Sequence, residues 1–178
     1  MKTPKLVFFV RSGERLPCPI CYGELGCIGS RPRKCIDSEI VVRILMIRRL
    51  KCDECSKIHH ELPDILVPYK RHTSECFEKV LGAVEPDEPS HVPVEDSTLN
   101  RWKGWFDGSV VHWVGALVAV NAEVNDTHEA ALPAASMSPL QTIWQLVGRG
   151  RGWLARVVRI VVNSVKWLQT RSACLSAV

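Results

Sequence analysis

Two pairs of cysteines are the residues of this chain whose type and spacing most directly suggest chemistry. The first pair is Cys18-x-x-Cys21 and the second is Cys52-x-x-Cys55. Two intervening residues allow one tight turn to present both sulfurs to a single ion, and two such turns complete a four-thiolate zinc site. Redox-active dithiols are the alternative, but they seldom occur as a matched pair in a β-hairpin context. The spacing therefore predicts one structural Zn²⁺ per chain, bound by Cys18, Cys21, Cys52 and Cys55.

The other cysteines and two neighbouring histidines have less specific interpretations. We interpret four cysteines as small buried side chains, with extra ligation as an alternative for the first two: Cys27, Cys35, Cys76 and Cys174. His59 and His60 follow the second cysteine pair. Packing or contact with a phosphate is favoured for them over ligation, because four thiolates already complete a zinc site. The sequence does not decide whether Cys27, Cys35 or either histidine adds to metal binding.

A second set of residues is suited to contacts with nucleic acid. A segment at residues 97–107 reads as a capped amphipathic helix, whose apolar face carries Leu99, Trp102 and Phe106. Polar side chains near the start of such a helix are the types that contact DNA in helix-turn-helix proteins. The alternative is an ordinary helix with a solvated polar face. The predicted DNA-contacting residues are Arg48, Arg49, Lys70, Arg71, Asn100, Arg101 and Lys103.

The elements that must position these residues indicate an α+β fold. Residues 1–66 are expected to form a β-rich zinc ribbon, with strands near residues 6–10 and 40–50. Residues 67–108 are expected to be a helix-turn-helix-like region with a helix at 74–82 and an acidic, Pro-rich linker. Residues 109–178 then comprise an apolar segment, a loop and C-terminal basic amphipathic helices. The apolar segment, at 109–122, is ambiguous between strand and helix.

The last helix, expected over Trp153–Leu168, has a stripe of basic and polar residues on an otherwise apolar surface. Packing on the rest of the chain or in an oligomer interface is favoured over contact with a membrane surface, because the apolar arc is wide. The stripe consists of Arg156, Arg159, Asn163 and Lys166. The residues expected to be buried are Trp153, Leu154, Val157, Val158, Val161, Val162, Val165 and Leu168.

Composition and motifs exclude several classes of protein. The chain has 178 residues, a net charge of +4 and 46% hydrophobic residues, which exclude a disordered chain and a large multidomain enzyme. No apolar stretch reaches the roughly 20 residues of a membrane-spanning helix, so no transmembrane segment is expected. His60-Glu61 is not followed by the second histidine of a metalloprotease motif, and no nucleophile elbow is present. We therefore expect no enzymatic activity.

Several short motifs follow one another in a characteristic order: Cys18–Cys21, Ile28–Arg31, Ile47–Cys52, Ile58–Asp64 and Val67–Arg71, followed by Asp96–Trp102 and Gly152–Val158. Their order resembles a family of uncharacterised bacterial proteins that carry a zinc-ribbon domain of unknown function. This family is akin to the N-terminal zinc-ribbon and helix-turn-helix regions of insertion-sequence transposases. The resemblance is strongest over residues 18–75 and implies a zinc-dependent DNA-binding protein linked to mobile elements.

These observations predict a zinc-stabilised protein that binds double-stranded DNA, as a regulator or a transposition-related accessory. One alternative is a protein–protein adaptor that docks a partner, or a second copy, through its C-terminal helices; another is a truncated transposase fragment. Because no export signal is recognised, we expect a reducing cytoplasm, where cysteines favour metal binding over disulfides, and association with the nucleoid if DNA is the partner. The target site, the preference for DNA over RNA, the oligomeric state and the biological process do not follow from the sequence.

Overall fold

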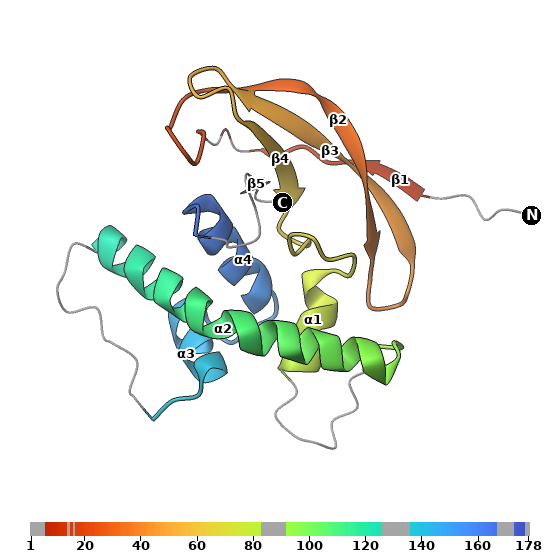
Figure 1. Cartoon of the computed structure of the whole chain (residues 1–178). Coiled ribbons are helices and arrows are strands. Elements are labelled where there is room, and N and C mark those ends of the chain that lie inside the picture. Colours follow the sequence, from red (N-terminus) through yellow and green to blue (C-terminus); the bar gives the residue numbers. More distant parts are fainter. Residues whose placement is uncertain are drawn as a thin grey trace, which may run out of the picture.

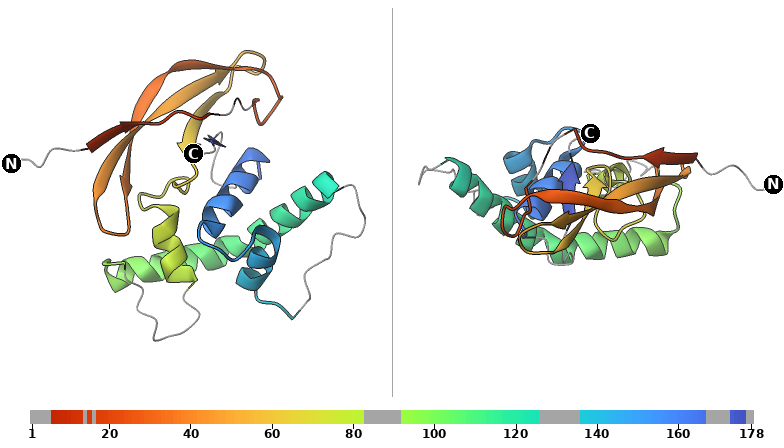
Figure 2. Two further views of the ribbon diagram at one scale, coloured as in Figure 1. Left: turned by 180° about the vertical axis from the view of Figure 1, so that it is seen from behind. Right: turned by 90° about the horizontal axis from the view of Figure 1, so that it is seen from above.

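The computed structural model describes residues 6–13, 15, 17–82, 92–125, 136–166 and 173–176 of the chain. Its elements confirm the α+β prediction. The N-terminal strands are β1 (Leu6–Phe9), β2 (Leu25–Ile36), β3 (Val42–Cys52) and β4 (Ile58–Pro63). The helices α1 (Ser74–Leu81), α2 (Asp96–Asn125), α3 (Pro139–Val147) and α4 (Trp153–Asn163) follow, before the short strand β5 (Ala173–Ser176). The sheet forms one layer and the helices the other (Figure 1, Figure 2).

Strand β3 is the centre of the sheet. Its whole length pairs antiparallel with β2, so both of its other partners must lie along its second edge. There β1 runs parallel to residues 43–46, and β4 runs antiparallel to residues 49–51. Strand β5 pairs in parallel with the far edge of β4, so the C-terminal end of the chain joins the sheet built by the N-terminal part.

One hydrophobic core joins the sheet to all four helices. Leu45 and Ile47 of β3 belong to the same buried cluster as Phe77 of α1, Trp102 of α2 and Leu154 of α4. Aromatic contacts run through it, with ring centroids 4.4 Å apart for Phe77 and Trp102. The face of β3 that carries Leu45 and Ile47 is therefore the one that packs on the helices.

Helix α2 resolves the ambiguity over residues 109–122, since one continuous helix runs from Asp96 to Asn125. Buried side chains recur along it every three or four residues, which places them on one side of a helix. These are Trp102, Phe106, Val110, Trp113 and Leu117. Residues 82–95 separate α1 from α2. This segment is longer than the three- or four-residue turn of a helix-turn-helix motif, so that motif is not shown.

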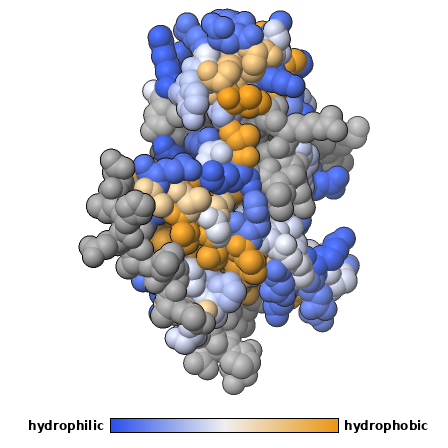
Figure 3. Space-filling view, turned by 60° about the vertical axis from the view of Figure 1, so that its left-hand side comes forward, coloured by the Kyte–Doolittle hydropathy of each residue, from blue (hydrophilic) through white to orange (hydrophobic). Residues whose placement is uncertain are grey.

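The solvent-facing side of α2 also carries hydrophobic side chains. Val111 and Val124 are 73% and 75% exposed, and hydrophobic residues gather over the helical half of the molecule in Figure 3. Even so, no helix within the described parts of the chain has both the length and the apolar character needed to cross a membrane.

The last two helices follow their sequence signals closely. Helix α3 begins after a capping box formed by Ser138 and Gln141, with Pro139 in the first turn. Helix α4 buries most of the residues expected to be buried: Trp153, Leu154, Val157, Val158, Val161 and Val162. Val165 was predicted to be buried as well, but it is 52% exposed because α4 ends at Asn163. Leu168 lies outside the described residues.

Candidate metal centre and basic surface

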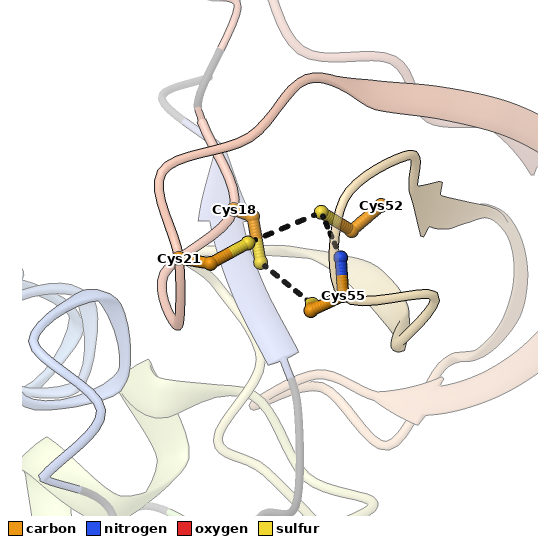
Figure 4. A group of neighbouring side chains, drawn as sticks. All are labelled: Cys18, Cys21, Cys52 and Cys55. Atoms are coloured by element: carbon orange, nitrogen blue, oxygen red, sulfur yellow. Dashed lines mark hydrogen bonds between the residues drawn. The ribbon is translucent and has the colours of Figure 1, made fainter.

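The four cysteines of the two Cys-x-x-Cys pairs lie together. Their sulfurs converge from two loops, one before β2 and one between β3 and β4 (Figure 4). All four lie within 4.8 Å of one another. The Sγ atoms of Cys18 and Cys55 are 3.7 Å apart, and those of Cys21 and Cys52 are 3.4 Å apart. A disulfide would need about 2.05 Å, so the sulfurs are spaced for a shared ion and not for bonds to each other.

The two loops have the local geometry that the cysteine spacing predicts. In the first, the backbone N–H of Tyr22 donates to the carbonyl of Cys18, which closes the turn between the two cysteines. In the second, Ser56 donates to the carbonyl of Cys52 in the same way. Tyr22 and Ser56 both have a positive φ, of 64° and 57°, because the chain must reverse sharply just after each second cysteine.

The electrostatics of the cluster favour a bound cation. The backbone N–H of Cys55 donates to Sγ of Cys52 and is the main reason why the pKa of Cys52 falls to about 7. The N–H of Gly23 lowers the pKa of Cys21. The hydrogen bond between Cys21 and Cys52, with partial desolvation by neighbouring atoms, outweighs this and raises the pKa of Cys21 to about 12. Four adjacent thiols therefore do not ionise together at neutral pH unless a metal ion neutralises them.

The structure can now place the other cysteines and the histidines. Cys35 and Cys76 are buried as predicted, at 1% and 0% exposure. Cys27 is exposed, which corrects its assignment as a buried side chain; the β2 register shifts between Cys27 and Gly29, and its thiol donates to the Gly29 carbonyl. The side chain of Cys174 is outside the described residues. His59 is fully buried, with Nε2 at 3.4 Å from Sγ of Cys18.

The predicted DNA-contacting residues of β3 point to opposite faces of the sheet, because consecutive strand residues alternate. Arg48 lies on the face that carries Cys52, where its guanidinium binds the buried carboxylate of Glu61. This ion pair borders a pocket of about 600 Å³ beside the first cysteine loop. Arg49 lies on the opposite face, next to His60 of β4. Residue type alone does not separate these two arginines.

Neighbouring basic side chains connect Arg49 with the start of α2. We call this group the basic surface; it comprises Arg31, Arg33, Arg49, Lys70, Arg71 and Arg101. Burial is the main cause of the lowered pKa of Arg33, and the neighbouring charges of Arg31 and Arg71 lower it further. The charges of Arg31, Arg49 and Arg33 likewise add to the effect of burial on His60, whose pKa is also lowered.

The basic surface extends from the sheet to the start of α2. The guanidinium of Arg33 donates to the carbonyl of Lys70 at 2.9 Å, and the ammonium of Lys70 lies over the ring of Trp105. The charge of Arg101 adds to burial in lowering the pKa of Lys70. Asn100 and Lys103 are exposed on the same part of α2. Within the described ranges, none of the six cations of the basic surface forms an ion pair with a carboxylate.

A family model matches part of this chain. Residues 18–102 match the family model described as Domain of unknown function (DUF6431), a span that includes both cysteine pairs and the start of α2. No curated protein and no solved structure matches the chain. The cysteine cluster and the basic surface therefore both lie within the segment that this family model covers.

Proposed function

We propose that this chain is a Zn²⁺-stabilised module that binds double-stranded DNA through the basic surface. The observation that carries the proposal is the set of six neighbouring cations with no carboxylate partner among the described residues. Like charges held close together repel one another, so the fold keeps them together at a cost. A polyanion removes that repulsion, and phosphates of a duplex are spaced closely enough to contact several of these side chains at once.

Zn²⁺ is the metal that the cysteine cluster fits best. Soft thiolates select zinc over hard cations such as Mg²⁺ and Ca²⁺. Bonds of about 2.3 Å in a tetrahedron place neighbouring sulfurs about 3.8 Å apart, close to the 3.7 Å between Cys18 and Cys55. The same four cysteines fill every position around the ion, which leaves none for a substrate. We therefore propose a structural role for the metal and a binding module without catalytic activity.

The proposed interface keeps most of the contacts expected from sequence and adds two. Arg49, Lys70, Arg71 and Arg101 belong to the basic surface, and Asn100 and Lys103 extend it along α2. Arg31 and Arg33 of β2 join them because β2 pairs with β3 next to Arg49. We leave Arg48 out of the interface, because its charge is bound to Glu61 on the other face. As a regulator or transposition accessory, the protein would use this interface to position itself on DNA.

The test measures duplex binding by the zinc-loaded full chain across a salt series, with fluorescence anisotropy as the readout. Binding should weaken steeply with salt, because each phosphate contact releases counterions and adds about 0.9 to the logarithmic slope. The variant Arg31→Ala/Arg49→Ala/Arg101→Ala should reduce the slope by up to about 3 and the affinity at least about tenfold. A zinc-chelated sample should also bind less.

A charge-matched variant makes the test specific. Lys79→Ala/Arg149→Ala/Arg151→Ala removes the same charge from α1 and from the loop between α3 and α4. Its affinity should stay close to that of the unchanged chain. Equal losses in both variants would show that only net charge matters, and absence of binding at low salt would contradict the proposal altogether.

A further inference from the structure

His59 is a buried histidine that makes direct contact with the metal centre. It lies on β4, opposite Leu50 of β3, and its side chain is 0% exposed. Its Nε2 atom is 3.4 Å from Sγ of Cys18, one of the four clustered cysteines. Its Nδ1 atom is buried and has no hydrogen-bond partner among the described residues. Burial of an imidazole with an unpaired ring nitrogen costs free energy, so the contact of the other nitrogen with Cys18 must offset that cost.

The arrangement of the two nitrogens indicates which one carries the proton. A metal-bound cysteine is a thiolate, which can only accept a hydrogen bond. The contact between Nε2 and Cys18 is therefore favourable only when Nε2 carries the hydrogen. Nδ1 is then a bare acceptor. The opposite tautomer would face two electron pairs toward each other and bury an N–H donor without a partner, which is the more costly arrangement.

We propose that His59 is a positioning residue of the metal centre, donating its Nε2–H to the Cys18 thiolate without itself binding the metal. This inference rests on the metal binding proposed above. Four thiolates already complete the tetrahedron, so the imidazole is not needed as a ligand. Its hydrogen bond partly neutralises the thiolate charge and fixes the direction of the Cys18 side chain, as groups around metal ligands commonly do.

The position of His59 also connects the cysteine loops to the sheet. Cys18 belongs to a loop, whereas His59 is held in a strand between β3 and β5. The next residue, His60, points to the opposite face and lies within the charge field of Arg31, Arg49 and Arg33. Strand β4 therefore carries a metal-centre contact and a basic-surface neighbour at adjacent positions. Loss of the His59 contact should loosen the first cysteine loop before it affects the rest of the sheet.

The test compares three variants of the full chain: His59→Gln, His59→Asn and His59→Leu. The Gln amide nitrogen reaches about as far as Nε2, the Asn amide stops near Nδ1, and Leu has no donor. Zinc affinity is measured by competition with a colorimetric chelator, and ligand number by the thiolate-to-metal absorption of the Co²⁺-loaded protein. His59→Leu and His59→Asn should lower the zinc affinity about 10- to 100-fold, whereas His59→Gln should restore most of it.

The Co²⁺ absorption distinguishes positioning from ligation. Its intensity per metal should correspond to four thiolates in the unchanged chain and in every variant, with a shifted band where the N–H is lost. A three-thiolate intensity in the unchanged chain would identify His59 as a ligand and overturn the proposal. Equal affinities for the Gln, Asn and Leu variants would overturn it as well.

Failure of this inference is distinguishable from failure of the proposed metal centre. If the unchanged chain takes up one equivalent of metal and His59→Leu holds it equally well, only the role of His59 is wrong. If the unchanged chain takes up no metal, the metal centre itself is wrong and the role of His59 is wrong with it. Circular dichroism of the polar pair, Gln and Asn, shows whether both fold, so that their comparison stands even where the Leu variant does not fold.

Discussion

The basic surface and the C-terminal basic stripe are two parts of the molecule that look alike in sequence and have different surroundings in the fold. Both combine arginine and lysine with apolar residues. In the basic surface, no described carboxylate pairs with Arg31, Arg49 or Arg101. In the C-terminal part, the cations are engaged by other groups of the same chain.

Arg156 of α4 shows this engagement most clearly. Its Nε donates to the carbonyl of Val147 at 2.6 Å, and its two terminal nitrogens donate to three carbonyls in the loop between α3 and α4. Those carbonyls belong to Gly148, Gly150 and Arg151. Lys166 pairs with Glu123 of α2, and its own carbonyl accepts from His112. Two cations of the stripe, Arg156 and Lys166, are therefore bound by acceptors of the same chain.

The comparison teaches that a run of basic residues predicts binding only after internal acceptors are counted. Backbone carbonyls at helix ends lack an intrahelical partner, so a guanidinium group can bind several of them within its own chain. They cannot be found from charge counts, because every residue carries one.

The largest effect is expected from Cys52→Ser. Removing one thiolate leaves three ligands, so the chain should lose its stoichiometric zinc, and the sheet should lose a contribution on the order of 10 kcal/mol to its folding. Zinc content and thermal unfolding with and without chelator measure this. Cys27→Ser is the matched control: it removes an exposed thiol outside the cluster and should keep one zinc per chain. One zinc per chain in Cys52→Ser would disprove the assignment.

A smaller effect, confined to the C-terminal part, is expected from Arg156→Ala. Charge-assisted hydrogen bonds contribute about 1.5–3 kcal/mol each when isolated, and less when several share one exposed side chain. We expect a loss of about 2 kcal/mol in the free energy of unfolding, measured by urea denaturation. DNA affinity should stay unchanged at temperatures where the variant is folded, because the charge removed is not on the basic surface.

Arg149→Ala is the control for that change. Arg149 lies in the same loop, is exposed, and places its guanidinium over the ring of Trp144. Its loss should cost about 0.5–1 kcal/mol, as an exposed cation–π contact does. If Arg156→Ala weakened DNA binding as strongly as loss of the basic surface, the distinction between the two basic regions would be wrong.

Signals that depend on near neighbours in sequence predicted structure well. The Cys-x-x-Cys spacing predicted the cluster because each pair needs only one tight turn. The recurrence of Trp153, Val157 and Val161 every four residues predicted the buried side of α4. The helix at residues 74–82 is confirmed for the same reason, ending one residue earlier.

Features that depend on distant parts of the chain were beyond the sequence. The faces of Arg48 and Arg49 follow from the β3 register, which needs β2, β4 and the helices to be in place. The pairing of β4 with β5 joins segments more than a hundred residues apart, and no periodicity signals it. The contact between Cys18 and His59 depends on the same assembly. Long-range geometry, and not residue type, decided these outcomes.

The smallest expected effect concerns Glu78, a buried acid of α1 at the start of the C-terminal α4. Its carboxylate accepts from the backbone N–H groups of Gly152 and Leu154, at 2.8 and 2.9 Å. Burial is the largest cause acting on it and raises its pKa above the ordinary value, although these N–H groups lower it in part. The folded protein therefore takes up this proton at a higher pH than the unfolded chain does.

The sign of the resulting pH dependence follows from that direction. Stability linked to Glu78 is fully present below the unfolded pKa of about 4.3 and is lost as the pH rises through the higher folded pKa. Relative to Glu78→Gln, the unchanged chain should therefore gain stability as the pH falls from 7 toward 5, by about 1.4 kcal/mol for each unit between the two pKa values. Urea denaturation of both proteins at several pH values measures the difference. A difference that shrinks or stays constant over this range would show that the N–H groups of α4, and not burial, dominate at Glu78. The N–H groups at the start of α4 would then stabilise the charged form of Glu78 more than burial destabilises it.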